Sequence, residues 1–154
     1  MGTAMFYHLT RSGPDEVLAL ILPRALAAGW RVMLRSPDTA RLERLEARLW
    51  LDPEDSFVPH GMEGGAFDAD QPVLLGQGPA VNGAQGVVLL DGAGPLPGEE
   101  ALERLWVLFD GGNEAAVQAA RGLWTRITGL GMAAQYWSED TGRWVMKTEK
   151  KPAE

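Results

Sequence analysis

Three carboxylates and a histidine lie close together in the segment LWLDPEDSFVPHG, residues 49–61. Asp52, Glu54, Asp55 and His60 are residue types that bind metal ions or exchange protons in acid/base catalysis. A zinc site would need more nitrogen or sulfur ligands, but the chain has only two histidines and no cysteine. A calcium loop needs alternating oxygen ligands and a central glycine, which the segment lacks. We therefore expect no metal here and interpret the segment as a solvated loop or a contact surface.

The turn after the first expected strand is a second place for chemistry, because nucleotide-binding α/β proteins hold phosphates there. It reads LTRSGPDE, residues 9–16, without the G-x-G-x-x-G spacing, and no G-x-x-x-x-G-K-[ST] occurs in the chain. The glycine-rich run at 76–86 falls between two expected strands and does not open a helix. Ser12 and Ser56 lie outside any G-x-S-x-G motif. The residues predict no catalytic group and no cofactor, and a nucleotide-dependent enzyme remains the alternative class.

The composition is that of an ordinary globular domain of 154 residues, 45% hydrophobic and 23% charged. The absence of cysteine, of a signal-like N-terminus and of a long apolar segment predicts a cytoplasmic protein without membrane spans. The net charge of -7 disfavours direct binding of single-stranded DNA through stacked tryptophans. Charge is uneven, with eleven acidic residues and one basic residue in 52–112, and six basic and three acidic residues in 121–151. An acidic middle and a basic C-terminal quarter can serve two different partners.

Hydrophobic periodicity predicts strands that alternate with helices. Helices are expected at 13–28, 37–50, 98–109 and 113–129. Strands are expected at 4–9, 30–35, 72–75 and 86–91, and the C-terminal runs 132–137 and 143–147 read as two strands or as one strand and a tail. Ser12 and Asp15 suit the start of the first helix and Gly29 its end. The order predicts a single α/β domain with a Rossmann-like open, mostly parallel sheet flanked by helices over 1–147, and a disordered charged tail, 148–154.

The order of several segments resembles the chi subunit of bacterial DNA polymerase III holoenzyme. The segments are FYHL, GWRVMLRSPD, RLEARLW, SFVPHG, DQPVLL, NGAQGVVLL, LWVLFDG and AARGLWTRITGLGMAAQYW. The resemblance runs from about Met5 to Lys147. It implies a non-catalytic accessory subunit of the polymerase that joins the clamp loader through the psi subunit and binds the acidic, Pro-Phe-ending C-terminal tail of single-stranded DNA-binding protein. Polymerase activity would then come only from membership of the complex.

By this resemblance, the tail-binding surface falls on the expected helix 113–129. Arg121 matches the arginine that pairs with the tail's terminal carboxylate, and Trp124 matches an aromatic residue of the phenylalanine pocket. A guanidinium takes a carboxylate bidentately, and an adjacent aromatic wall buries an apolar ring, so the pair suits a Phe-ending acidic peptide. The remaining tail-binding candidates are Phe109, which would close the pocket, and Arg126, Arg143 and Lys147, which would steer the acidic residues. Val117, Gly122 and Thr125 depart from the more basic family pattern.

A second surface, facing the psi subunit, is assigned by looser analogy with the family. Its candidate residues are Trp50, Phe57, Val58, Pro59 and His60. No direct sequence-specific contact with nucleic acid is expected. Trp106, Trp137 and Trp144 are interpreted as core or rim residues, because periodicity alone does not place them.

Overall fold

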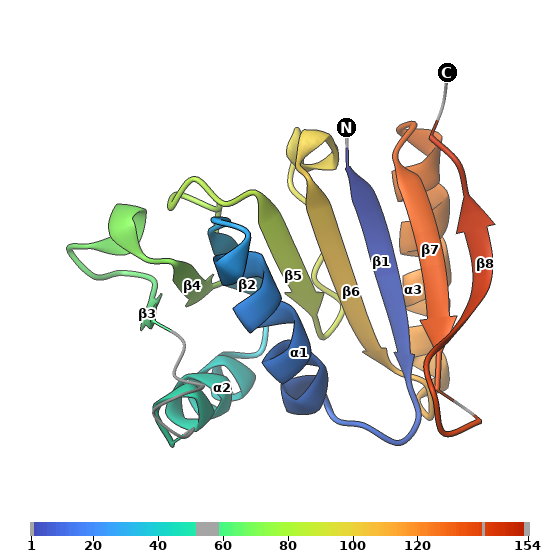
Figure 1. The fold of residues 1–154 in the computed structure, drawn as a ribbon, viewed down its shortest axis with the longest axis horizontal. Coiled ribbons are helices and arrows are strands. Elements are labelled where there is room, and N and C mark those ends of the chain that lie inside the picture. The colour runs from blue at the N-terminus through green and yellow to red at the C-terminus, as the bar shows by residue number, and fades with distance from the viewer. Residues whose placement is uncertain (1, 52–58, 140, 153–154) are drawn as a thin grey trace.

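An eight-stranded sheet forms the centre of the molecule, in the order β3-β4-β2-β5-β6-β1-β7-β8 (Figure 1). This computed structural model describes residues 2–51, 59–139 and 141–152. All neighbouring strands run parallel except β7 and β8. The predicted open, mostly parallel α/β sheet is confirmed. The strands are β1 (Thr3–Leu9), β2 (Val32–Arg35), β3 (His60–Met62), β4 (Val73–Gly76), β5 (Gly86–Leu90), β6 (Arg104–Asp110), β7 (Ala133–Ser138) and β8 (Val145–Lys150).

Helices cover the two faces of the sheet unequally. Among the described residues the α-helices are α1 (Pro14–Ala27), α2 (Thr39–Leu51) and α3 (Glu114–Gly129), with short 3-10 turns at Asp68–Asp70 and Glu99–Ala101. In Figure 1, α1 and α2 stand in front of the sheet, and α3 lies behind β1 and β7. We call the front side the α1 face and the back side the α3 face. No helix in the described ranges is both long and apolar enough to cross a bilayer.

The start of α1 lies one residue later than the sequence predicted. Gly13 is the N-cap, and its backbone N–H donates to the Glu16 carboxylate at 3.3 Å. Ser12, the predicted cap, donates its hydroxyl to Glu139 instead, at 2.8 Å. The predicted stop is confirmed, because Gly29 follows the helix with a φ of +81°, which favours glycine. Pro23 lies inside the helix.

The helix predicted at 98–109 is wrong. Only Glu99–Ala101 forms a helical turn, and Arg104–Asp110 is the strand β6, between β5 and β1. A strand buried on both faces of a parallel sheet reads as one continuous apolar run, and LWVLF is such a run. Hydrophobic periodicity alone does not distinguish such a run from a buried helix. The acidic residues Glu99 and Glu100 before it are also typical of the first turn of a helix.

A buried ion pair ties together the loops at the carboxyl ends of the strands. The Arg35 guanidinium donates to both carboxylate oxygens of Glu99, at 2.7 and 2.8 Å. It also donates to the carbonyls of Gly78 and Gly94, at 3.1 and 3.4 Å. The backbone N–H of Leu96 donates to the same carboxylate at 2.8 Å. One arginine therefore holds the loop after β4 and the loop after β5 in a fixed relation.

The two predicted C-terminal strands form an antiparallel pair with a bulge between Tyr136 and Trp137. β8 ends at Lys150 and so includes residues 148–150, which the sequence assigned to a tail. Opposite residues in an antiparallel pair share a face. Thr148, opposite Tyr136, and Lys150, opposite Ala134, therefore lie on the same face as these β7 residues.

Candidate functional site

A crevice opens where the helices after β1 and β6 leave the sheet on opposite faces. In open α/β proteins such a switch point, at the carboxyl ends of the strands, is where ligands bind. A cavity of about 940 Å³ lies there, with Ser12 and Gly13 on one side and Asp110 and Asn113 on the other. Its third wall is the side of α3 that carries the small residues Ala115, Ala119 and Gly122. This crevice is the first candidate for a nucleotide site.

The turn before α1, at one edge of that crevice, already binds an anion from the chain itself. The Glu139 carboxylate accepts backbone N–H bonds from Thr10, Arg11 and Ser12, at 3.1, 2.8 and 2.6 Å. Burial of Glu139 favours the neutral acid, but the bonds from Ser12, Arg11 and Thr10 outweigh it and hold the pKa of this carboxyl below its usual range. A charged carboxylate occupies the donors that would bind a phosphate and repels a second anion. The geometry therefore argues against a dinucleotide in this turn.

The predicted pair on α3 lies in an aromatic cluster on the α3 face. The Trp124 ring packs edge-on against Phe6, with ring centroids 5.2 Å apart, and lies 6.3 Å from Tyr136. Arg121 lies three residues before Trp124 on α3, on the same side of the helix. Burial raises the pKa of the Tyr136 hydroxyl, and the charge of Arg121 opposes part of that rise. Arg121 is exposed, whereas Trp124 and Tyr136 are half-buried. A cation beside partly exposed rings is the arrangement that a carboxylate next to an aromatic side chain would fit.

Phe109 joins this cluster through two residues that the sequence did not single out. Its ring centroid lies 5.8 Å from Tyr136 and 5.3 Å from His8. His8 Nδ1 and the Tyr136 hydroxyl form a 2.7 Å hydrogen bond. Phe109 is only 8% exposed, so it supports the cluster from below. Tyr136 and Ala134 are two residues apart on β7 and therefore share a face of the strand. This spacing is visible in the sequence, but the sequence does not show that this face packs against α3.

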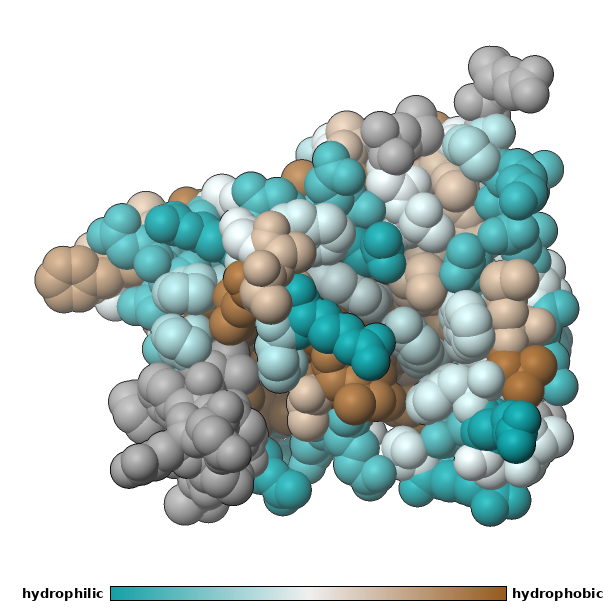
Figure 2. Space-filling view, viewed as in Figure 1, coloured by the Kyte–Doolittle hydropathy of each residue, from teal (hydrophilic) through white to brown (hydrophobic). Residues whose placement is uncertain are grey.

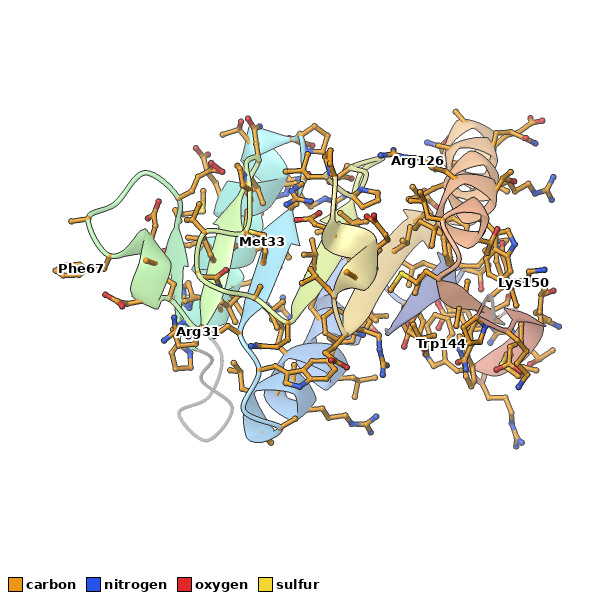
Figure 3. The ribbon with its side chains drawn as sticks, turned by 90° about the horizontal axis from the view of Figure 1, so that it is seen from above. Arg31, Met33, Phe67, Arg126, Trp144 and Lys150 are labelled. Carbon is orange, nitrogen blue, oxygen red and sulfur yellow. The ribbon has the colours of Figure 1, made fainter. Side chains whose placement is uncertain are left out.

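Arg126 lies on the other flank of α3, away from Arg121. Residues five apart on an α-helix are rotated by about 140°. The Arg126 guanidinium donates to the Pro95 carbonyl at 3.0 Å, and Figure 3 shows it reaching from α3 over the neighbouring loop. It lines the crevice rather than the aromatic cluster. The structure thus separates Arg121 and Arg126, which the sequence placed on one surface.

The basic residues of the last strand pair lie beside α3 and along the sheet edge. Arg143 is exposed in the turn between β7 and β8, and Lys147 is exposed at the bulge of β8. Lys150, which was assigned to the tail, shares its face with Ala134 of the α3-side core. Lys150 is therefore better placed than Arg143 to extend the positive charge of Arg121.

The psi-facing candidates are described only in part. Phe57 and Val58 lie outside the described residues, as does the side chain of Trp50, whose backbone belongs to α2. Pro59 is exposed. The His60 imidazole is 0% exposed and lies 3.8 Å from Glu46, so only the backbone of His60 remains accessible to a partner.

Taken together, the chain is an α/β open-sheet protein with a self-occupied phosphate turn and a cationic aromatic surface on α3. It belongs to the DNA polymerase III chi subunit family, whose model (DNA polymerase III chi subunit, HolC) matches residues 1–135. It is 32% identical, over 76 residues, to the DNA polymerase III subunit chi of Pseudomonas aeruginosa strain PAO1. That match covers 47% of this chain and 52% of the relative, so the chain spans about half the length of the curated relative it matches.

Proposed function

We propose that the protein is a non-catalytic accessory subunit of the DNA polymerase III holoenzyme, acting in the cytoplasm. It couples the clamp loader, through the psi subunit, to the acidic C-terminal tail of single-stranded DNA-binding protein. The observation that carries this proposal is that Arg121 is exposed on α3 three residues before Trp124, whose partly exposed ring lies 6.3 Å from that of Tyr136. The terminal carboxylate of the tail pairs with Arg121, and its last phenylalanine packs on the two rings.

A peptide titration tests the tail-binding part of the proposal. A peptide that ends in acidic residues, Ile, Pro and Phe binds the wild-type protein with micromolar affinity, measured by calorimetry or by anisotropy. Arg121→Ala weakens binding about 10- to 100-fold, because a charge-assisted pair is lost. Arg44→Ala removes an equal charge from the exposed side of α2 and is the matched control. Equal binding of a peptide that lacks the last phenylalanine would contradict the proposal.

Lys150 and Arg126 test how far the tail extends on either side of α3. Lys150 shares the face of the aromatic cluster, whereas Arg126 lines the crevice on the opposite flank. We expect Lys150→Ala to weaken binding of the acidic peptide a few-fold at low salt, with an effect that fades as salt is added. A larger loss from Arg126→Ala than from Lys150→Ala would move the tail into the crevice.

The docking to psi is proposed for the segment 50–60, where Pro59 is exposed. Co-purification of the protein with a psi subunit checks it, using Phe57→Ala as the variant and Arg121→Ala as a change on the distant surface. Loss of psi with Arg121→Ala and retention with Phe57→Ala would reverse the assignment of the two surfaces.

The alternative of a nucleotide-dependent enzyme rests on the cavity of about 940 Å³ at the switch point. Glu139 opposes it, because its carboxylate takes the backbone donors of the turn. Thermal shift measurements with nucleotides and dinucleotides decide between the two. A saturable rise in Tm would support the enzyme, whereas the accessory subunit shows none.

A further inference from the structure

The α1 face of the sheet is only half covered. In Figure 1, none of the described helices stands in front of β1, β7 and β8, although α3 lies behind them. Parallel strands are normally covered on both faces, because both faces are apolar. The far half of the α1 face is therefore a surface built from core strands without a helix over it.

The strand register shows which side chains form this surface. One row across β6, β1, β7 and β8 is Trp106, Met5, Gln135 and Glu149. The next row is Leu108, Tyr7, Trp137 and Met146. Trp144 stands edge-on against Tyr7, with ring centroids 5.3 Å apart, and points to the α1 side in Figure 3. Tyr7, Trp137 and Trp144 are half-buried, and Met146 is 41% exposed. Trp106 and Leu108, at the other end of the rows, are only 5% and 3% exposed and belong to the core. We call the partly exposed side chains Tyr7, Trp137, Trp144 and Met146 the open aromatic face.

Arginines lie at both ends of the open aromatic face. Arg104 begins β6, and Arg24 lies in the last turn of α1. Burial raises the pKa of the Tyr7 hydroxyl, and the charges of Arg104 and Arg24 oppose that rise. Arg104 also stacks on the Trp30 ring, 5.9 Å from its centroid. Arg24 is exposed on α1.

The opposite end of the open aromatic face lies at the carboxyl end of β1. The Arg11 guanidinium lies against Gly142, 3.4 Å from where a Cβ would stand, and Arg143 is the exposed neighbour of Trp144. The seven residues of β1 separate the two ends by about 20 Å at 3.3 Å per residue. Cations therefore bracket the aromatic rows along the strand direction.

The charge of this surface differs from that of the whole chain. The net charge is -7, yet Glu149 is the one acidic residue in the two rows, and its carboxylate pairs with Lys151 at 3.0 Å. Figure 2, in the same view, shows white and tan residues over the middle of this half of the molecule, with hydrophilic residues along its right edge and lower margin. The aromatic rings offer flat apolar surfaces on which a partner can stack. The arginines at the two ends favour a partner that carries negative charge over an uncharged apolar helix.

We propose that the open aromatic face binds single-stranded DNA without sequence preference. Bases pack on Trp137, Trp144 and Tyr7, and phosphates pair with the arginines at the two ends. Single-stranded nucleic acid binds in this way to sheet faces that are open on one side, because every base has a ring to stack and every linkage carries a charge. The strand runs on the sheet face opposite α3, so the tail peptide and the DNA do not compete. The inference does not depend on the proposed tail binding.

Anisotropy of a fluorescein-labelled oligothymidylate tests this proposal on the full chain. Binding at low salt weakens as salt rises, with a log–log slope of about -2 if three phosphates are neutralised. Trp137→Ala lowers the affinity about 5- to 50-fold, as loss of a stacked base does. Arg24→Ala lowers both the affinity and the salt slope, whereas Arg44→Ala, an equal charge change on α2, leaves both unchanged. Circular dichroism confirms that each variant is folded.

The same variants separate this proposal from the proposed function. Trp137→Ala keeps its affinity for the Phe-ending peptide, and Arg121→Ala keeps its affinity for the oligothymidylate. Absence of oligothymidylate binding at low salt, or equal binding by wild type, Trp137→Ala and Arg24→Ala, would overturn the DNA site. If the oligothymidylate does not bind and Trp137→Ala releases the protein from a clamp-loader preparation, the face is a protein interface.

Discussion

The two faces of β1 carry aromatic side chains in alternation but expose them differently. Phe6 is 0% exposed and lies under α3, against Trp124. Tyr7, its neighbour in the chain, points to the α1 face and remains half-buried beside Trp144. Both side chains are aromatic, as expected for a parallel strand whose two faces are normally both covered. What differs is the route of the crossover helix, because α3 passes over β1 while α1 stands over the other half of the sheet.

This difference shows that β1 is covered by a helix on one face of the sheet and left without one of the described helices on the other. On the α3 face, the helix leaves only the margin of the cluster, Trp124 and Tyr136, accessible for a peptide end. On the α1 face, Tyr7, Trp137, Trp144 and Met146 remain partly exposed across three neighbouring segments, which suits a longer, extended ligand. The expected stability effects below follow the same contrast.

Replacement of Phe6 and of Tyr7 by alanine is expected to give the largest difference in the free energy of unfolding. Phe6→Ala lowers the free energy of unfolding by about 3–5 kcal/mol, since a fully buried ring leaves a cavity. Tyr7→Ala costs less, because the ring is already partly hydrated and water refills the space. Urea denaturation of both variants checks this. Equal losses would mean that the open aromatic face is as closed as the α3 face.

Glu139 connects the end of β7 to the turn after β1, and its replacement has the second-largest expected effect. Glu139→Gln lowers the free energy of unfolding by about 2 kcal/mol at neutral pH, through loss of charge-assisted bonds from the turn at 10–12. The folded-state pKa is depressed, so this stabilisation is present above the unfolded-state pKa and is lost as pH falls through the folded-state pKa.

The pH dependence gives the control for Glu139. The wild-type protein loses stability on acidification more steeply than Glu139→Gln does, which urea melts at several pH values measure. Equal acid dependence of Glu139→Gln and the wild type would show that the pKa of Glu139 does not change on folding.

The cap of α3 tests how firmly the closed face is held. The Asn113 side chain accepts from the Ala116 backbone N–H at 3.1 Å. Asn113→Ala removes this bond and lowers the free energy of unfolding by about 1 kcal/mol. Asn113→Asp, which keeps the acceptor and adds a charge that suits a helix N-terminus, retains the stability. Thermal unfolding of the two variants makes the comparison.

The cap of α1 gives the smallest effect, in the opposite direction. Its N-cap is Gly13, which has no side-chain acceptor, an extended backbone with φ of -88°, and open space where a Cβ would stand. Gly13→Ser therefore raises the free energy of unfolding by a few tenths of a kcal/mol. A loss of stability on this change would mean that the turn at 10–13 is held in a conformation that serine disturbs.

Local patterns predicted most of the elements but not their neighbours in space. The helices α1, α2 and α3 were predicted to within a few residues, because their apolar spacing and end signals are local. β6 was taken for a helix, because burial on both faces removes the alternation that identifies a strand. Among the site residues, Arg121 and Trp124 were predicted on one side of α3, but Arg126 lies on the other.

The sequence by itself determined an alternating α/β chain without a phosphate loop, the aromatic alternation of β1 and the Arg121–Trp124 spacing on α3. Tertiary structure alone decided that Glu139 fills a turn 127 residues away and that Tyr136 meets His8 across 128 residues. It also decided which face of β1 receives a helix. The physical reason is that local patterns set each element, whereas the routes of the crossover connections set which elements meet and which surface stays open.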